Sequence, residues 1–79
     1  IRLSGTDRQK DYGDKTKNHD NIARLWSAYL DVKIEAHDVA LMMVLLKMAR
    51  TKLGKVSKDT YIDMSAYSAI AGEIKFKEE

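Results

Sequence analysis

The sequence contains no cysteine and no proline among its 79 residues, and only four glycines. Without cysteine the chain can form neither a disulfide framework nor a thiolate metal site, which is typical of proteins from reducing compartments. The longest hydrophobic run, residues 39–46, is far shorter than the roughly 20 residues that span a bilayer. The start carries no signal-peptide pattern. These absences favour a soluble, cytosolic protein without a membrane segment.

An excess of charge of one sign is also missing. The sequence has 14 Lys and Arg against 12 Asp and Glu, a net charge of +2, which by itself indicates no nucleic-acid or membrane partner. Its length allows one domain, residues 1–79, with ends expected to fray at 1–5 and 76–79. The core of such a short domain supplies only about 3 to 5 kcal/mol. A second copy is therefore one expected source of further stability.

The first part of the chain predicts two helices separated by a loop. Thr6 and Gln9 form a capping-box pattern and Gly13 can end a helix, which together predict a short helix over 7–12. The polar segment 14–18 then predicts a loop. The next helix should bury one stripe of apolar residues at helical spacing, formed by Ile22, Leu25, Trp26, Tyr29 and Leu30.

The second half predicts two more helices. The helix over about 37–53 is apolar almost all round, so we expect it to be either the central helix of the fold or half of a subunit interface. Gly54 should end it and Ser57 should cap the last helix. That helix is expected to bury two adjoining stripes, formed by Ile62, Ala66, Ile70 and Ile74 and by Met64, Tyr67 and Ala71. The predicted fold is all-α, a small bundle of three main helices with a short N-terminal helix.

No catalytic residue is assigned. A hydrolytic triad needs an activated Ser or Cys, and neither His19 nor His37 accompanies a nucleophile-elbow pattern. The four glycines match neither the Walker nor the dinucleotide-binding spacing. His37 beside Asp38 makes only a weak zinc signal, because the two histidines lack an i, i+4 relation.

The carboxylates Asp38, Asp59 and Asp63 are the candidate metal ligands, and Mg²⁺ is the cation they would hold. Asp59 and Asp63 share one helix face. In a helical hairpin, however, Asp38 lies at the opposite end, and an antiparallel dimer would be needed to bring it close. The alternative is structural, with Asp38 as a capping acid at the third helical position and Asp59 at the positive end of a helix dipole.

A basic segment follows the apolar helix, with no acid between residues 39 and 58. Its residues are Lys47, Arg50, Lys52, Lys55 and Lys58. Lys47 and Arg50 are the candidate nucleotide- or phosphate-binding residues. They could equally pair with Asp59 or Asp63 across the turn, and both alternatives remain open. A nucleic-acid partner is not favoured, because the basic residues form no stripe along one face.

Four ordered motifs resemble a family of short, uncharacterised proteins of tailed bacteriophages and prophages. The match covers roughly residues 7–74. The motifs are Arg8-x-x-Asp11-Tyr12-Gly13-Asp14, Asn21-Ile22-Ala23-x-Leu25-Trp26, His37-Asp38-Val39-Ala40 with Leu46-Lys47-x-Ala49-Arg50, and Asp59-x-x-x-Asp63-x-x-x-Tyr67. The resemblance implies a phage-encoded protein and brings no established activity with it.

A more distant likeness links the chain to phage nucleotide-modification-associated domains and to MazG-like all-α nucleotide pyrophosphohydrolases. It implies Asp38, Asp59 and Asp63 on the metal side of a nucleoside triphosphate, with Lys47 and Arg50 on the phosphate side. The sequence departs from those enzymes where their Glu-Glu-x-x-Glu run supplies the first metal ligands. At the comparable place it has Glu35-Ala36-His37-Asp38.

Two functional hypotheses follow. The favoured one is a small phage accessory protein that acts in the host cytoplasm by self-association as a homodimer or by binding a host or phage protein. Its apolar helix and its Met and aromatic residues would form the contact surface. The alternative is magnesium-dependent nucleotide binding or pyrophosphohydrolysis, and the sequence leaves open whether the chain is an enzyme.

Overall fold

The computed structural model describes residues 5–53 and 57–77, with side chains from residue 14 onward, and shows three helices. They are α1 (Gly5–Leu30), α2 (Ala36–Arg50) and α3 (Lys58–Phe76). The described residues contain no strand, which confirms the predicted all-α class. None of these helices is long and apolar enough to cross a membrane. The predicted roles of Gly54 and of the ends 1–4 and 78–79 lie outside the described residues.

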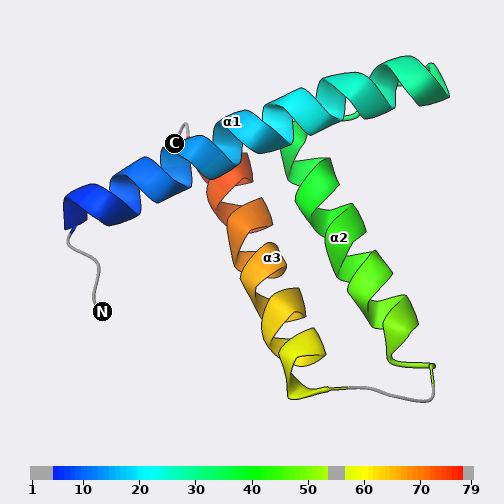
Figure 1. Cartoon of the computed structure of the whole chain (residues 1–79). Helices are drawn as coiled ribbons and strands as arrows, with labels where there is room; N and C mark the ends of the chain where they lie inside the picture. Colours follow the sequence, from blue (N-terminus) through cyan, green and yellow to red (C-terminus); the bar gives the residue numbers. More distant parts are fainter. Residues whose placement is uncertain (1–4, 54–56, 78–79) are drawn as a thin grey trace.

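The helices form an antiparallel hairpin with a crossing helix. α2 and α3 run side by side in opposite directions, and α1 lies across the end where α2 begins and α3 finishes (Figure 1). The molecule measures 41 × 39 × 20 Å. Its smallest dimension equals about two helix diameters. Much of each helix surface is therefore left without a neighbouring helix.

The predicted loop over 14–18 is wrong, because α1 continues through it as one helix of 26 residues. None of the described glycines adopts a positive φ, so Gly13 does not end the helix. Polar residues on a solvated helix satisfy their backbone hydrogen bonds internally and need no apolar stripe. The helix ends instead before Asp31, whose φ of 59° is the left-handed conformation that commonly follows a helix.

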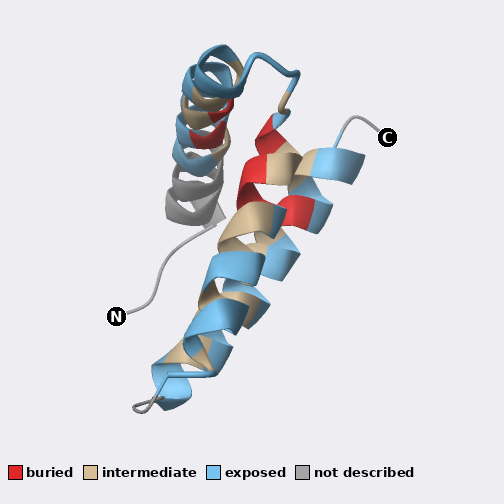
Figure 2. Ribbon diagram, turned by 90° about the vertical axis from the view of Figure 1, so that its right-hand side faces the viewer, coloured by how far each residue is buried: buried red, intermediate tan, exposed pale blue. Residues whose placement is uncertain are grey.

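The buried residues lie where the three helices meet (Figure 2). Among the residues whose side chains are described, the buried apolar set is small: Ala23, Ala36, Val39, Ala40 and Ala71. Four of the five are alanine, which lets the helix backbones approach closely but removes little apolar area from water. Val39 is the only large side chain of this set that is fully buried. The core is therefore confined to one end of the hairpin.

The predicted buried stripe of α1 is wrong at three of its five positions. Leu25, Tyr29 and Leu30 are exposed, whereas Ile22 and Trp26 are half-buried. α1 is most buried along the line of His19 and Ala23, displaced from the predicted stripe. The small side chain of Ala23 permits the close crossing that a bulkier residue would prevent.

The buried side of α3 is also displaced from the prediction. Ile62 and Ala66 are exposed, so the first predicted stripe is wrong in its N-terminal half. Met64, Tyr67 and Ala71 are buried or half-buried, as predicted for the second stripe, together with Ile70 and Ile74. α3 therefore turns the Met64–Tyr67–Ala71 side toward α2.

Side-chain hydrogen bonds fix the segment between α1 and α2. The Ile34 amide donates to Ser27 Oγ at 2.8 Å, and the Ser27 hydroxyl donates to the Ile34 carbonyl at 3.2 Å. The Glu35 amide donates to Asp38 Oδ2 at 3.0 Å, which makes Asp38 the capping acid of α2. These contacts hold the start of α2 against α1.

Candidate functional site

One side of α2 faces away from α3 and is apolar. Leu41, Leu45 and Met48 follow one another at spacings of four and three residues, and their exposed fractions are 45%, 60% and 47%. The opposite side carries the buried Val39 and Ala40 and the half-buried Met43. We call the exposed set Leu41, Leu45 and Met48 the outer face of α2. The other helices of this chain therefore cover one side of α2 and leave the outer face exposed. The sequence predicts, in contrast, that this helix is covered on most sides.

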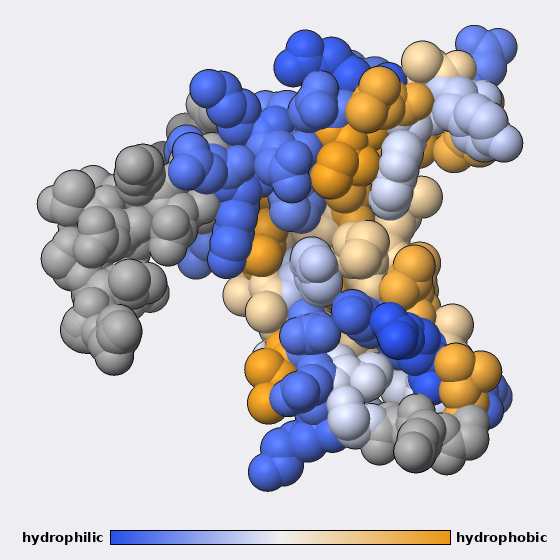
Figure 3. Space-filling model, viewed as in Figure 1, coloured by the Kyte–Doolittle hydropathy of each residue, from blue (hydrophilic) through white to orange (hydrophobic). Residues whose placement is uncertain are grey.

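A shallow groove of about 550 Å³ adjoins the outer face. It is lined by Met42, Leu45, Leu46, Ala49, Arg50 and Leu53. Five of these six residues are apolar, and hydrophobic side chains mark the edge of the molecule over α2 (Figure 3). A groove of this composition suits an apolar side chain from a partner surface better than a polar small molecule.

The total accessible surface of the chain is larger than that of a compact protein of this mass, and large apolar side chains contribute to it. The chain exposes 6186 Å², whereas a compact globular protein of 9.0 kDa exposes about 4,900 Å². The described part of the chain leaves twelve large apolar residues exposed: Leu25, Tyr29, Leu30, Val32, Leu41, Leu45, Leu46, Met48, Leu53, Tyr61, Ile62 and Phe76.

The two ends of α2 carry opposite charges. Glu35 and Asp38 stand at its start, with side chains 56% and 42% exposed. Arg50 and Lys52, both exposed, stand at its end. Each sign suits the helix dipole at its own end. The charges therefore bracket the outer face with an acidic end and a basic end.

The structure brings together two of the candidate nucleotide-site residues. Lys47 Nζ lies 3.2 Å from Asp63 Oδ2, which joins the last turn of α2 to the second turn of α3. The Lys47 side chain is 18% exposed and the Asp63 side chain 46% exposed. This is the pairing across the turn that the sequence left as an alternative to phosphate binding. Arg50, one turn further along α2, is exposed.

Asp38 and Asp59 stand apart, at opposite ends of the hairpin. Asp38 lies where α2 meets α1 and also approaches His37, with 3.4 Å between Asp38 Oδ1 and His37 Nε2. Asp59 lies in the first turn of α3, beside the connection from α2 (Figure 1). Within the described ranges, no three His, Asp or Glu residues gather closely enough to hold a metal ion.

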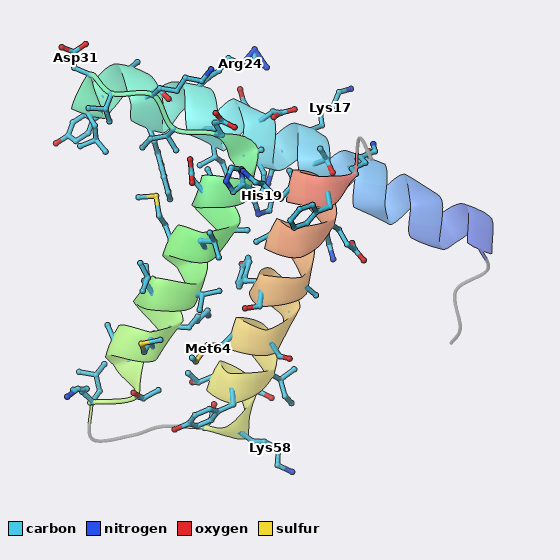
Figure 4. All side chains as sticks on the ribbon, turned by 180° about the vertical axis from the view of Figure 1, so that it is seen from behind. Lys17, His19, Arg24, Asp31, Lys58 and Met64 are labelled. Carbon is cyan, nitrogen blue, oxygen red and sulfur yellow. The ribbon has the colours of Figure 1, made fainter. Side chains whose placement is uncertain are left out.

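His19 is a buried residue that sequence reasoning passed over. It points from α1 toward the hairpin, while Lys17 and Arg24 lie on the other side of the helix (Figure 4). It is 6% exposed, its ring lies 6.5 Å from that of Tyr67, and its Nδ1 lies 2.7 Å from the Lys15 carbonyl. Its buried Nε2 has no hydrogen-bond partner among the residues that the structure describes. The available signal was the i+4 spacing from His19 to the small residue Ala23.

A second hollow, of about 610 Å³, lies where the three helices meet. Its charged lining includes Arg24, Lys33 and Lys75 together with Asp20 and Glu35. Because acids and bases alternate around it, the hollow does not form a strong field of either sign. Apolar residues complete the lining, namely Ala23, Ile34, Ala36 and Ile74.

Comparison with known proteins identifies the family. Residues 2–75 match the family described as "Domain of unknown function (DUF6378)", and the chain belongs to it. No solved structure is significantly similar to the chain.

Two relatives come from mycobacteriophages. The chain is 40% identical over 73 residues to the Gene 55 protein of Mycobacterium phage L5, covering 91% of this chain and 47% of that protein. It is 38% identical over 73 residues to the Gene 55 protein of Mycobacterium phage D29, covering 92% and 48%. The chain thus spans about half the length of these relatives. These matches confirm the coarse prediction of an uncharacterised phage protein family.

Proposed function

We propose that this DUF6378 protein is a phage-encoded accessory protein that acts in the host cytoplasm by self-association or by binding another protein. The contact surface is the outer face of α2 with its adjoining groove. The proposal extends the family resemblance with a specific surface and does not require catalysis.

The observation that carries the proposal is the distribution of apolar side chains. The buried apolar set consists of four alanines and one valine, whereas Leu41, Leu45 and Met48 are exposed in one continuous line. Burying a leucine side chain is worth about 1.5 to 3 kcal/mol. A partner that covers this line would supply stability that the small core of the chain does not.

The experiment is light scattering coupled to size exclusion on two matched variants. Leu45→Asp places a charge on the outer face, and Ile62→Asp places the same charge on the exposed side of α3. We expect Leu45→Asp to lower the mass in solution, or the capture of a co-purified partner, while Ile62→Asp leaves both unchanged. Equal behaviour of the two variants, both folded by circular dichroism, would remove the outer face as the contact surface.

Magnesium-dependent nucleotide binding is the second candidate. It is favoured by one observation, the approach of Lys47 Nζ to Asp63 Oδ2 with Arg50 one turn away on the same helix. A phosphate would compete with Asp63 for Lys47. A cation held by Asp63 would release Lys47 from this ion pair. Asp38 and Asp59 would complete a cation site only after a rearrangement or across two copies. Nucleotide pyrophosphohydrolysis would require such a completed site.

An amide-shift NMR titration with Mg²⁺ and nucleoside triphosphates tests this candidate. Binding should produce saturable shifts around Lys47, Arg50 and Asp63, and the Asp63→Asn variant should lose the magnesium-dependent part. Asp20→Asn, on the exposed side of α1, is the matched control. Equal affinity in the Asp63→Asn variant and the unaltered chain would argue against this assignment.

A further inference from the structure

We infer that the outer face of α2 docks on the same face of a second copy, with the two α2 helices antiparallel and Leu45 at the twofold axis. This inference rests on the proposed function and names its partner and orientation. The residues that carry it are Asp38, Leu41, Leu45, Met48 and Lys52.

These five residues follow the 3,4,3,4 spacing of a two-stranded helical seam. Three apolar residues occupy the middle of the seam. The acid Asp38 stands at one end and the base Lys52 at the other. Lys52 lies just beyond α2, where the chain continues to turn in the same sense. Its amide donates to the Ala49 carbonyl at 3.2 Å, and the Leu53 amide donates to the Arg50 carbonyl at 3.1 Å. The seam is therefore continuous from Asp38 to Lys52.

The charges choose the orientation. Leu45 stands midway between Asp38 and Lys52, seven residues from each. An antiparallel pair centred on Leu45 sets Asp38 of each copy opposite Lys52 of the other. A parallel pair would instead set Asp38 against Asp38 and Lys52 against Lys52. Opposite charges at the ends of an apolar seam favour one orientation and penalise the other. Antiparallel helices also align their dipoles favourably.

The end of α1 extends this contact. Figure 1 shows α1 continuing past the start of α2 on the side away from α3. The last turns of α1 expose Leu25, Tyr29 and Leu30, and Tyr29 is 88% exposed. Val32, which follows the helix, is exposed as well. In the antiparallel pair this arm lies over the far end of the partner's α2, where Leu53 is exposed. Both copies make the same contact, as twofold symmetry requires.

The absence of cysteine makes the orientation measurable with single substitutions. The variants are Leu45→Cys, Leu41→Cys and Ala49→Cys, all at exposed positions of α2. About the proposed axis, position 45 of one copy faces position 45 of the other, and position 41 of one copy faces position 49 of the other. Two copies of position 41 lie about 12 Å apart along the helices, at 1.5 Å per residue, which is beyond the reach of a disulfide. Mild oxidation of each variant, alone and in a mixture, is read on a non-reducing gel.

The expected result is a crosslinked pair for Leu45→Cys alone and for the mixture of Leu41→Cys with Ala49→Cys, and none for Leu41→Cys alone. Self-crosslinking of Leu41→Cys would overturn the antiparallel orientation while leaving self-association intact. Failure of every combination, with a solution mass of two copies, would place the dimer contact elsewhere. A mass of one copy for the unaltered chain would overturn the second copy as the partner and leave another protein as the occupant.

Discussion

Lys47 Nζ and Asp63 Oδ2 lie 3.2 Å apart and link the last turn of α2 to the N-terminal part of α3. The contact stands well away from the alanine-rich end, where the buried residues are gathered. It is an ion pair between α2 and α3 in the half of the hairpin that lies away from α1. It also engages two of the residues that the nucleotide hypothesis would use, so a phosphate would have to displace Asp63 from Lys47, and a cation would have to displace Lys47 from Asp63.

The Asp63→Asn substitution should lower the free energy of unfolding by about 0.5 kcal/mol, since partly exposed ion pairs contribute between 0 and 1 kcal/mol. Chemical denaturation measures the change. Combining it with Lys47→Met in a double-mutant cycle isolates the coupling between the two side chains. Strictly additive effects would show that the pair contributes nothing in solution.

Met43→Asp should be much more damaging to stability than Leu45→Asp. Met43 is half-buried on the side of α2 that carries Val39 and Ala40, whereas Leu45 is 60% exposed. A carboxylate forced into a packed helix contact costs roughly 2 kcal/mol or more. Thermal unfolding followed by circular dichroism compares the two, at a concentration low enough to separate the copies. Similar melting temperatures would contradict the assignment of the two sides of α2.

Ser27→Ala should destabilise the chain by about 1 kcal/mol, because it removes the hydroxyl that bonds both the amide and the carbonyl of Ile34. Ser65→Ala is the matched control, on an exposed position within α3. There alanine should be neutral or slightly stabilising because of its helix propensity. If Ser27→Ala proved as harmless as the control, the connection between α1 and α2 would not depend on these bonds.

His19→Phe should change the free energy of unfolding by less than about 1 kcal/mol, because it removes the unpartnered Nε2 together with the contact between Nδ1 and the Lys15 carbonyl. Within the described part of the chain the buried Nε2 has no hydrogen-bond partner, and another aromatic ring can occupy the place beside Tyr67. Chemical denaturation of the two proteins measures the difference. A loss of more than about 2 kcal/mol would indicate that Nε2 has a partner in solution.

Lys52→Asp should weaken self-association roughly three- to tenfold, because it sets two carboxylates together at each end of the seam. Lys17→Asp makes the same change of charge on the side of α1 away from the hairpin (Figure 4), and serves as the control. Sedimentation at several protein concentrations gives both dissociation constants. Equal constants would remove the charge argument for the antiparallel orientation.

The sequence predicted the helical class and the position of α2 because these depend on local signals. The apolar run over 39–46 and the absence of proline favour a helix there over any other element. The sequence predicts this helix at 37–53, and the structure shows it at Ala36–Arg50. The capping role of Asp38, weighed as an alternative, is present in the structure. The pairing of Lys47 with Asp63 was likewise among the alternatives considered.

Other features depend on how helices cross, which local spacing does not determine. The stripe of Leu25, Tyr29 and Leu30 is amphipathic by spacing, yet α1 meets the hairpin along His19 and Ala23. The polar segment 14–18 has no apolar residues that would indicate a helix. It is helical as part of α1, which packs against the hairpin at His19 and Ala23. Exposed apolar residues on α1 and α2 follow the same spacing as buried ones. The sequence therefore left open whether the apolar α2 was a core helix or an interface.

The measurement that tests the central claim most directly is sedimentation equilibrium of the unaltered chain over a wide concentration range. If the outer face of α2 is filled by a second copy, the mass should rise with concentration from 9.0 kDa to twice that value and stop there. Growth beyond two copies would contradict a closed twofold contact. A constant mass of one copy up to millimolar concentration would contradict self-association altogether.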